Sequence, residues 1–219
     1  GSSRLIADIP GNSMARGKKI SIVLVGAGGM GRRWAEAIAA HSRTSLTGII
    51  DTDHGKAEAL GKICRAPFSH SLKDFLRDKT PDAACIAIPP AFSKQAIADC
   101  LKAGLHVITE KPAARNAAEL RELVSLAGKK RLRFMVGYNY RHFPHIRKAH
   151  ELVQKGAIGK VLFIRGRHGA SGRPGYEHDW RHNPRLSGGG VLIDQAVHTI
   201  DLAQWFLKEL KEVSGMLAH

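Results

Sequence analysis

The sequence predicts an α/β protein in which a doubly wound parallel sheet is followed by a partial α+β domain. Apolar runs such as ISIVLV at residues 20–25 are too uniform for a strand with one face in water, and they suit a parallel strand buried on both faces. Such runs alternate with helical stretches at the spacing of βαβ units. The first run also leads directly into a glycine-rich turn, VGAGGMG, and then into a helical stretch.

Each expected strand of the parallel sheet is an apolar run that stops at glycine, proline or a charged residue. The expected strands are 20–25, 45–51, 82–90, 106–112 and 133–140, and the expected helices are 31–42, 55–63, 71–78, 92–104 and 117–130. After residue 141 the pattern changes to a helix at 145–156, a strand at 160–168, a polar loop, a helix within 186–206 and a strand at 211–219. Right-handed crossovers place the ends of parallel strands along one edge of the sheet, where we expect the ligand.

The composition is that of an ordinary globular protein, but the charge is unusual. The chain has 219 residues, a net charge of +15 and a pI near 10.1. This excess favours an anionic ligand or partner, with solvated basic helix faces as the alternative. The basic stretch GKKRLRF at residues 128–134 is short and lies between structured elements, so nucleic acid is not the expected partner.

The three cysteines lack the spacing of a disulfide framework or a metal site. Cys64, Cys85 and Cys100 are scattered, which is typical of a reducing compartment and predicts a cytoplasmic protein. No apolar run approaches the roughly 18 residues of a membrane span, and no segment resembles a secretory signal. A membrane partner is therefore not expected.

The glycine-rich turn and the acid after the second strand point to a dinucleotide. Gly26, Gly28 and Gly31 form G-x-G-x-x-G between strand and helix, where glycines permit a tight turn, close approach of a pyrophosphate and close helix packing. The helix N-terminus offers free N–H groups to the phosphates. Asp51 ends the second strand, where it can bind a ribose and repel a 2′-phosphate, so NAD is favoured over NADP. The alternative is a plain turn with a capping aspartate.

Two further sites carry residues suited to hydride-transfer chemistry. Lys111 follows an apolar strand at the predicted ligand edge, where its ammonium can stabilise an alkoxide; a surface lysine is the alternative. Asp194 and His198 stand at i and i+4 on a predicted helix, so they share one face, and a neutral imidazole can accept a hydroxyl proton. A capped core helix is one alternative. A metal site that also includes Asp201 is another, although no metal is expected.

Five motifs occur in order: VGAGGMG, IAIPP, GLHVITEKP, VGYNYRHFP and SGGGVLIDQAVHTIDLAQWF. In these motifs the chain, from about Lys18 to its end, resembles the glucose–fructose oxidoreductase, inositol dehydrogenase and rhizopine catabolism family (Gfo/Idh/MocA). The resemblance implies a Rossmann domain, a C-terminal α/β domain and oxidation or reduction of sugars or cyclitols with NAD(P). It further implies that Lys111 contacts cofactor and substrate, that Asp194 orients substrate and base, and that His198 is the general base.

The chain departs from the family pattern in two ways. Ala196 stands where the family has glycine, and the chain is shorter than its relatives, with only part of the second domain. We therefore expect a leader or expression remnant at residues 1–17, a dinucleotide-binding Rossmann domain at 18–141 and a partial substrate domain at 142–219. An uncovered sheet face in that partial domain favours a truncated chain or a homo-oligomer.

The expected function is an NAD-dependent sugar or cyclitol oxidoreductase. The alternatives are a non-catalytic dinucleotide- or sugar-sensing protein, an inactive truncated homologue and an NAD-dependent glycosidase. The predicted site residues fall into three groups. The catalytic group is Lys111, Asp194 and His198; the cofactor group is Gly26, Gly28, Gly29, Met30, Gly31, Asp51, Pro89, Glu110 and Lys111; and the substrate group is Asn139, Arg141, Tyr176, Trp180 and Arg181, with Arg173 and His178 in the same polar loop.

Overall fold

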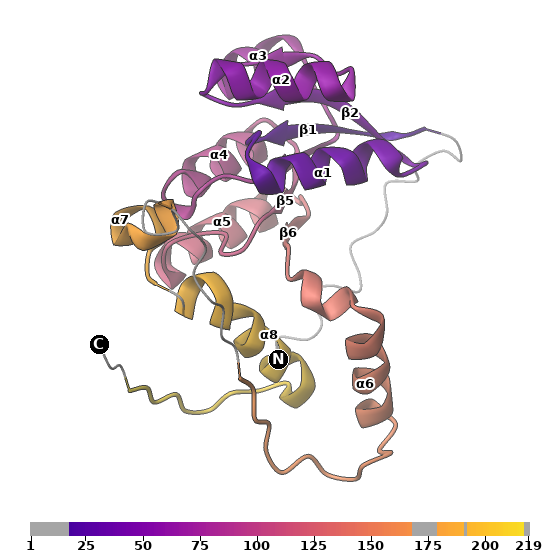
Figure 1. Cartoon of the computed structure of the whole chain (residues 1–219), viewed down its shortest axis with the longest axis vertical. Coiled ribbons are helices and arrows are strands. Elements are labelled where there is room, and N and C mark those ends of the chain that lie inside the picture. The colour runs from indigo at the N-terminus through magenta and orange to yellow at the C-terminus, as the bar shows by residue number, and fades with distance from the viewer. Residues whose placement is uncertain (1–17, 168–178, 191, 217–219) are drawn as a thin grey trace. The chain divides into compact units, whose positions relative to one another are not determined.

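The six strands of the sheet follow the order β3-β2-β1-β4-β5-β6. Strands β1, β2, β5 and β6 are labelled in Figure 1. The computed structural model describes residues 18–167, 179–190 and 192–216. The order is that of a Rossmann sheet, and β1–β2, β2–β3 and β5–β6 pair in parallel, as the apolar strands predicted. The chain divides into two compact units, one that ends at Ala84 and one that begins at Cys85.

The first unit alternates strands and helices. Its elements are β1 (Ile20–Val25), α1 (Gly29–Ala40), β2 (Thr44–Ile50), α2 (His54–Cys64), β3 (Phe68–Ser69) and α3 (Leu72–Asp78). Val23, Leu24 and Ile49 are completely buried, which explains why these strands are continuous apolar runs. Capping side chains start two of the helices: Asp53 accepts a hydrogen bond from the Lys56 N–H, and Ser71 does the same for α3.

The second unit continues the alternation and then becomes helical. It contains the end of β4 (Ala83–Ile86), α4 (Pro90–Lys102), β5 (His106–Thr109), α5 (Ala117–Lys129) and β6 (Phe134–Val136). These are followed by η1 (Asn139–His142), α6 (Pro144–Gln154), η3 (Trp180–His182), α7 (Pro184–Ser187), η4 (Leu192–Ala196) and α8 (Val197–Leu207). Ile86, Ile97 and Leu101 are completely buried and form the centre of its core.

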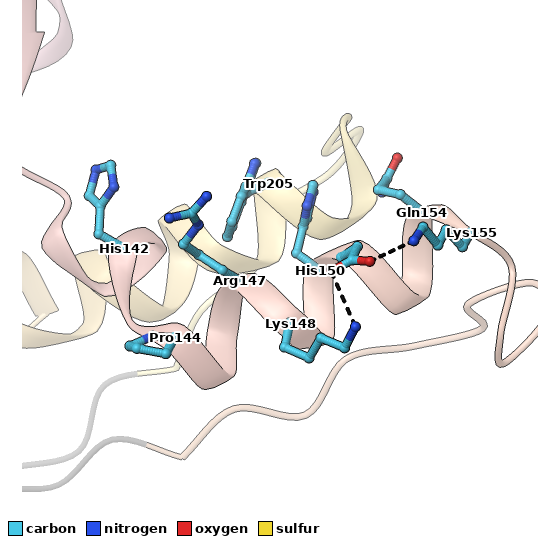
Figure 2. A pocket seen from close by; sticks show the side chains of 9 residues that line it. His142, Pro144, Arg147, Lys148, His150, Gln154, Lys155 and Trp205 are labelled. Atoms are coloured by element: carbon cyan, nitrogen blue, oxygen red, sulfur yellow. Dashed lines mark hydrogen bonds and ion pairs between the residues drawn. The ribbon is translucent and has the colours of Figure 1, made fainter.

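Helices α6 and α8 lie side by side within the second unit. The rings of His150 and Trp205 stack with centroids 3.8 Å apart, and a groove of about 700 Å³ lies beside them (Figure 2). Glu151 on the exposed side of α6 pairs with Lys148 at 3.3 Å and with Lys155 at 2.6 Å. Among the described helices, none is long and apolar enough to cross a membrane.

Neither of the two strands expected after residue 141 forms in the residues that the structure describes. Residues 161–167 and 209–216 have no regular secondary structure, and Leu162 and Phe163 are 84% and 78% exposed. A strand forms only where a neighbouring strand completes its hydrogen bonds, and the described part of the chain beyond residue 142 contains no such neighbour. The apolar pattern alone was therefore not sufficient to predict strands in these described residues.

Candidate active site

The glycine turn of the first unit has the geometry that its motif predicted. Gly26 has a φ of +103°, a conformation that disfavours other residues. A Cβ on Gly31 would lie 1.8 Å from the carbonyl oxygen of Gly26, so α1 packs directly on the turn. A Cβ on Gly28 or Gly29 would meet no atom within 4 Å. The turn is therefore closed on its packed side and open above the start of α1.

The open side of this turn fits a pyrophosphate. Helix α1 begins after Gly28 without a side-chain cap and without an acidic residue in its first turn, so its N–H groups and positive dipole end are available to an anion. Asp51 lies beside the turn: one carboxylate oxygen accepts the Ala27 N–H at 2.7 Å, and the other accepts the Asp53 N–H at 2.9 Å. The glycine turn, the uncapped helix and this carboxylate are the parts that a dinucleotide site requires.

Replacement of Gly31 by alanine is expected to destabilise the first unit. The new methyl group would overlap the main chain of Gly26, which cannot move away as a flexible side chain can. We expect a loss of about 1–3 kcal/mol in the free energy of unfolding, measured by urea denaturation. The matched control is Gly29→Ala, where the methyl group enters open space. Equal stability of the two variants would contradict the packing role of Gly31.

In the second unit, Lys111 meets Asp194 across 83 residues of sequence. Lys111 directly follows Glu110 after β5, and its Nζ donates hydrogen bonds to the main-chain carbonyl of Asp194 and, at 3.0 Å, to Oδ1 of its carboxylate. The two side chains are only 12% and 7% exposed. The lysine is thus a buried, paired cation and not the surface lysine of the alternative interpretation.

The segment that carries Asp194 begins as a π-helical turn and not as the regular helix expected. The wider turn spans Leu192–Ala196 and continues as α8; such turns are frequent at functional sites. The preceding glycines serve the packing of this segment: a Cβ on Gly189 would lie 2.5 Å from Ile193, and Gly188, with a φ of +81°, lies against the main chain of Arg115. Only at Gly190 is the space around a Cβ open.

Asp194 is surrounded by donors. Besides Lys111, the Nε of Arg181 lies 3.3 Å from Oδ2, and the side-chain amide of Gln195 donates to the same oxygen at 2.8 Å. Burial raises the pKa of Asp194, but hydrogen bonds from Lys111 and Gln195 and the charges of Lys111 and Arg181 outweigh burial, so its pKa lies below the ordinary value. The carboxylate is therefore ionised.

His198 lies one helical turn after Asp194 and is 5% exposed. Its ring stacks on Tyr140 with centroids 4.1 Å apart and an interplanar angle of 8°, and Tyr138 meets it edge-on at 6.3 Å. Both tyrosines follow β6 on either side of Asn139. Neither tyrosine was among the predicted site residues, although their i, i+2 spacing at a strand end was a usable signal. The two rings fix the plane of the imidazole.

Asp201 and Arg141 form a separate pair beside this imidazole. The Arg141 guanidinium binds the Asp201 carboxylate through two contacts of 2.7 and 2.5 Å, and it lies 5.6 Å from the Trp205 ring. The carboxylate side chain is 7% exposed. Because Asp194 and Asp201 each bind a cation, and because no group of three potential ligands occurs anywhere in the described residues, the structure offers no support for the metal interpretation.

The remaining predicted residues fall in several places. Asn139 is exposed at the start of η1, and Trp180 stacks under the Arg181 guanidinium at 4.5 Å. Pro89 caps α4, and the main-chain N–H of Glu110 donates to Ile86 at 2.8 Å. Met30 lies in the first turn of α1.

Three predicted residues of the polar loop lie outside the described residues: Arg173, Tyr176 and His178. The roles of all these residues in binding stay predictions.

Two family models match the chain. Residues 20–138 match the GFO_IDH_MocA model, described as an oxidoreductase family with an NAD-binding Rossmann fold. Residues 146–219 match the GFO/IDH/MocA C-terminal domain.

Similar proteins come from bacteria and include dehydrogenases. A levoglucosan dehydrogenase from Pseudarthrobacter phenanthrenivorans is 31% identical over 159 residues, which cover 70% of this chain and 41% of that protein. An inositol 2-dehydrogenase from Rubrobacter xylanophilus is 30% identical over 199 residues, or 88% of this chain and 53% of that protein. The crystal structure of GenD2 from gentamicin A biosynthesis in complex with NAD superposes with a TM-score of 0.79 at 26% identity, and the match covers 91% of this chain and 57% of that chain. The chain thus spans about half the length of the relatives it matches.

Proposed function

This chain belongs to the GFO/IDH/MocA oxidoreductase family, and we propose that the whole protein transfers a hydride between a hydroxyl carbon of a sugar or cyclitol and the nicotinamide of NAD. The family match and the dehydrogenases among the relatives supply the reaction class. The single observation that carries the proposal is the buried Lys111–Asp194 pair, followed one turn later by the buried His198. Buried ionisable groups that converge within one unit are typical of a reaction site.

The cofactor is proposed to bind at the glycine turn. The open surface at Gly28 and Gly29 and the uncapped start of α1 suit its pyrophosphate, and Asp51 suits the adenosine ribose. The negative charge of Asp51 disfavours the 2′-phosphate of NADP, so NAD is the preferred form. Met30, Pro89 and Glu110 complete the proposed cofactor residues.

The proposed mechanism follows from the charges of the second unit. Bound NAD would supply the hydride acceptor: the substrate C–H bond would break, its electron pair would leave with the hydrogen as hydride, and the carbon would become a carbonyl carbon. A ring nitrogen of His198 accepts the proton of the hydroxyl, so the oxygen becomes the carbonyl oxygen. The Lys111 ammonium stabilises the negative charge that develops on that oxygen. Asp194 holds the Lys111 ammonium in place through the 3.0 Å contact of its Oδ1.

A panel of sugars and cyclitols tests this function. The whole protein is mixed with NAD or NADP and each candidate substrate, and formation of reduced cofactor is followed by its absorbance. We expect reduction with at least one polyol and a faster rate with NAD. Release of a chromogenic aglycone without net NADH would support the glycosidase alternative. NAD binding without reduction by any polyol would support the sensing or inactive alternative.

We propose that the protein works in the cytoplasm as a homo-oligomer. All three cysteines are free thiols, which fits the cytoplasm. Exposed apolar side chains in residues 158–164 and 210–216 suit burial against other protein, which supports a homo-oligomer through the C-terminal domain. We propose the boundary between the cofactor and substrate domains at residues 141 and 142. Light scattering of the whole protein tests the assembly.

A further inference from the structure

The Asp194 carboxylate uses its two oxygens for two different cations. Oδ1 accepts from the Lys111 ammonium at 3.0 Å, whereas Oδ2 faces the Nε of Arg181 at 3.3 Å and the amide of Gln195 at 2.8 Å. Lys111 also binds the main-chain carbonyl of the same aspartate. Rotation of the carboxylate would break its contacts on both sides at once, so the position of the lysine amine depends on what holds Oδ2.

Arg181 is itself anchored within η3. Its Nη1 binds both carboxylate oxygens of Asp179, at 2.9 and 3.0 Å, and its main-chain N–H donates to Oδ1 of Asp179 at 3.1 Å. Its guanidinium lies 4.5 Å from the Trp180 ring centroid. The side chains of Asp179 and Arg181 are 14% and 25% exposed. An anchored guanidinium loses little further freedom when it also binds Asp194.

We propose that Arg181 is a positioning residue that holds the Asp194 carboxylate against the Lys111 amine. The four side chains form a row of alternating charge, from Asp179 through Arg181 and Asp194 to Lys111. Arginine suits this place because its planar group presents Nε to one carboxylate and Nη1 to the other, which a lysine cannot do with one nitrogen. This role rests on the proposed function only in that Lys111 acts on the substrate oxygen. It differs from the direct substrate contact expected for Arg181.

The charges around Asp194 give the role a measurable signature. Lys111 faces it from the end of β5, Arg181 faces it from η3, and Gln195 neighbours it in η4. The folded-state pKa of Asp194 is lowered, so its ionised form persists until the pH falls through that low value. Loss of the Arg181 charge raises this pKa. Activity that needs the ionised carboxylate is then lost at a higher pH than in the unchanged enzyme.

The test uses Arg181→Gln and Arg181→Lys in the whole protein. We expect Arg181→Gln to lower kcat about tenfold to a hundredfold, because the lysine amine is misplaced, with little change in the KM for NAD. In the Arg181→Gln variant, the acid limb of the pH profile of kcat should move up by about one pH unit. Arg181→Lys keeps the positive charge, but its single nitrogen can contact only one of the two carboxylates. This variant should therefore restore the acid limb and only part of kcat. Arg185→Gln, at an exposed arginine on α7, is the matched control and should change neither.

A readout without turnover separates this proposal from the proposed function. The carboxyl carbon of Asp194 is titrated by carbon-13 NMR, with its signal assigned through Asp194→Asn. An upward shift of its midpoint in Arg181→Gln supports the positioning role even if no polyol reduces NAD. An unmoved midpoint in a folded Arg181→Gln protein overturns it. A higher substrate KM with an unchanged pH profile would also overturn it, in favour of direct substrate contact.

Discussion

His198→Gln is expected to lower the turnover of the whole protein by about 10²–10⁴, the usual contribution of a general base. Glutamine retains a polar side chain in this buried place, but it cannot accept a proton at working pH. The stacked ring of Tyr140 and the edge of Tyr138 define a narrow site for a flat group, so the replacement should be accommodated without unfolding. The affinity for NAD should stay nearly unchanged, because the proposed phosphate site is at Gly28 and Gly29.

Steady-state kinetics and calorimetric titration with NAD measure the two effects of His198→Gln separately. The matched control is His145→Gln, at an exposed histidine of α6, which should leave turnover unchanged. Turnover within tenfold of the unchanged enzyme would show that another group takes the hydroxyl proton. A loss of NAD binding in parallel with turnover would instead indicate a general disturbance of the fold.

Lys111→Met is expected to reduce both activity and stability. Removal of the ammonium takes away the stabilisation of the developing oxyanion, which we expect to lower kcat about 10²–10³-fold. It also leaves a carboxylate, 7% exposed, without one of its donors, at a cost of about 1.5–3 kcal/mol in the free energy of unfolding. Arg181 and Gln195 remain beside Asp194 and limit the loss. Turnover and urea denaturation measure the two effects.

The pH dependence of the stability loss identifies its cause. In the fold the pKa of Asp194 is lowered, so its ionised form stabilises the protein above the unfolded pKa, and this contribution disappears as the pH falls through the folded pKa. The destabilisation by Lys111→Met should therefore be largest near neutral pH and decrease in acid. The double variant Lys111→Met with Asp194→Asn should regain stability at neutral pH but no activity. A pH-independent loss would contradict the electrostatic origin.

Much of the first unit was predictable because its signals are local. The turn from Gly26 to Gly31 depends on residues close in sequence, and alanine at Gly31 would clash with Gly26 itself. The apolar strands were recognised because a parallel strand is buried on both faces whatever its neighbours are. The same local logic was wrong at the described residues 160–167, where strand formation depends on a partner strand, and it missed the short β3.

The sequence by itself determined the class of fold, the place of the glycine turn and the residue types of the candidate site, since each follows from patterns within a few turns of chain. Only the tertiary structure decided which groups those residues meet. It brought Lys111 to Asp194 and Arg141 to Asp201, across 83 and 60 residues, and it placed Tyr140 against His198. Such contacts depend on how β5, β6 and α8 pack, and a packing of distant elements leaves no periodic signal in the chain.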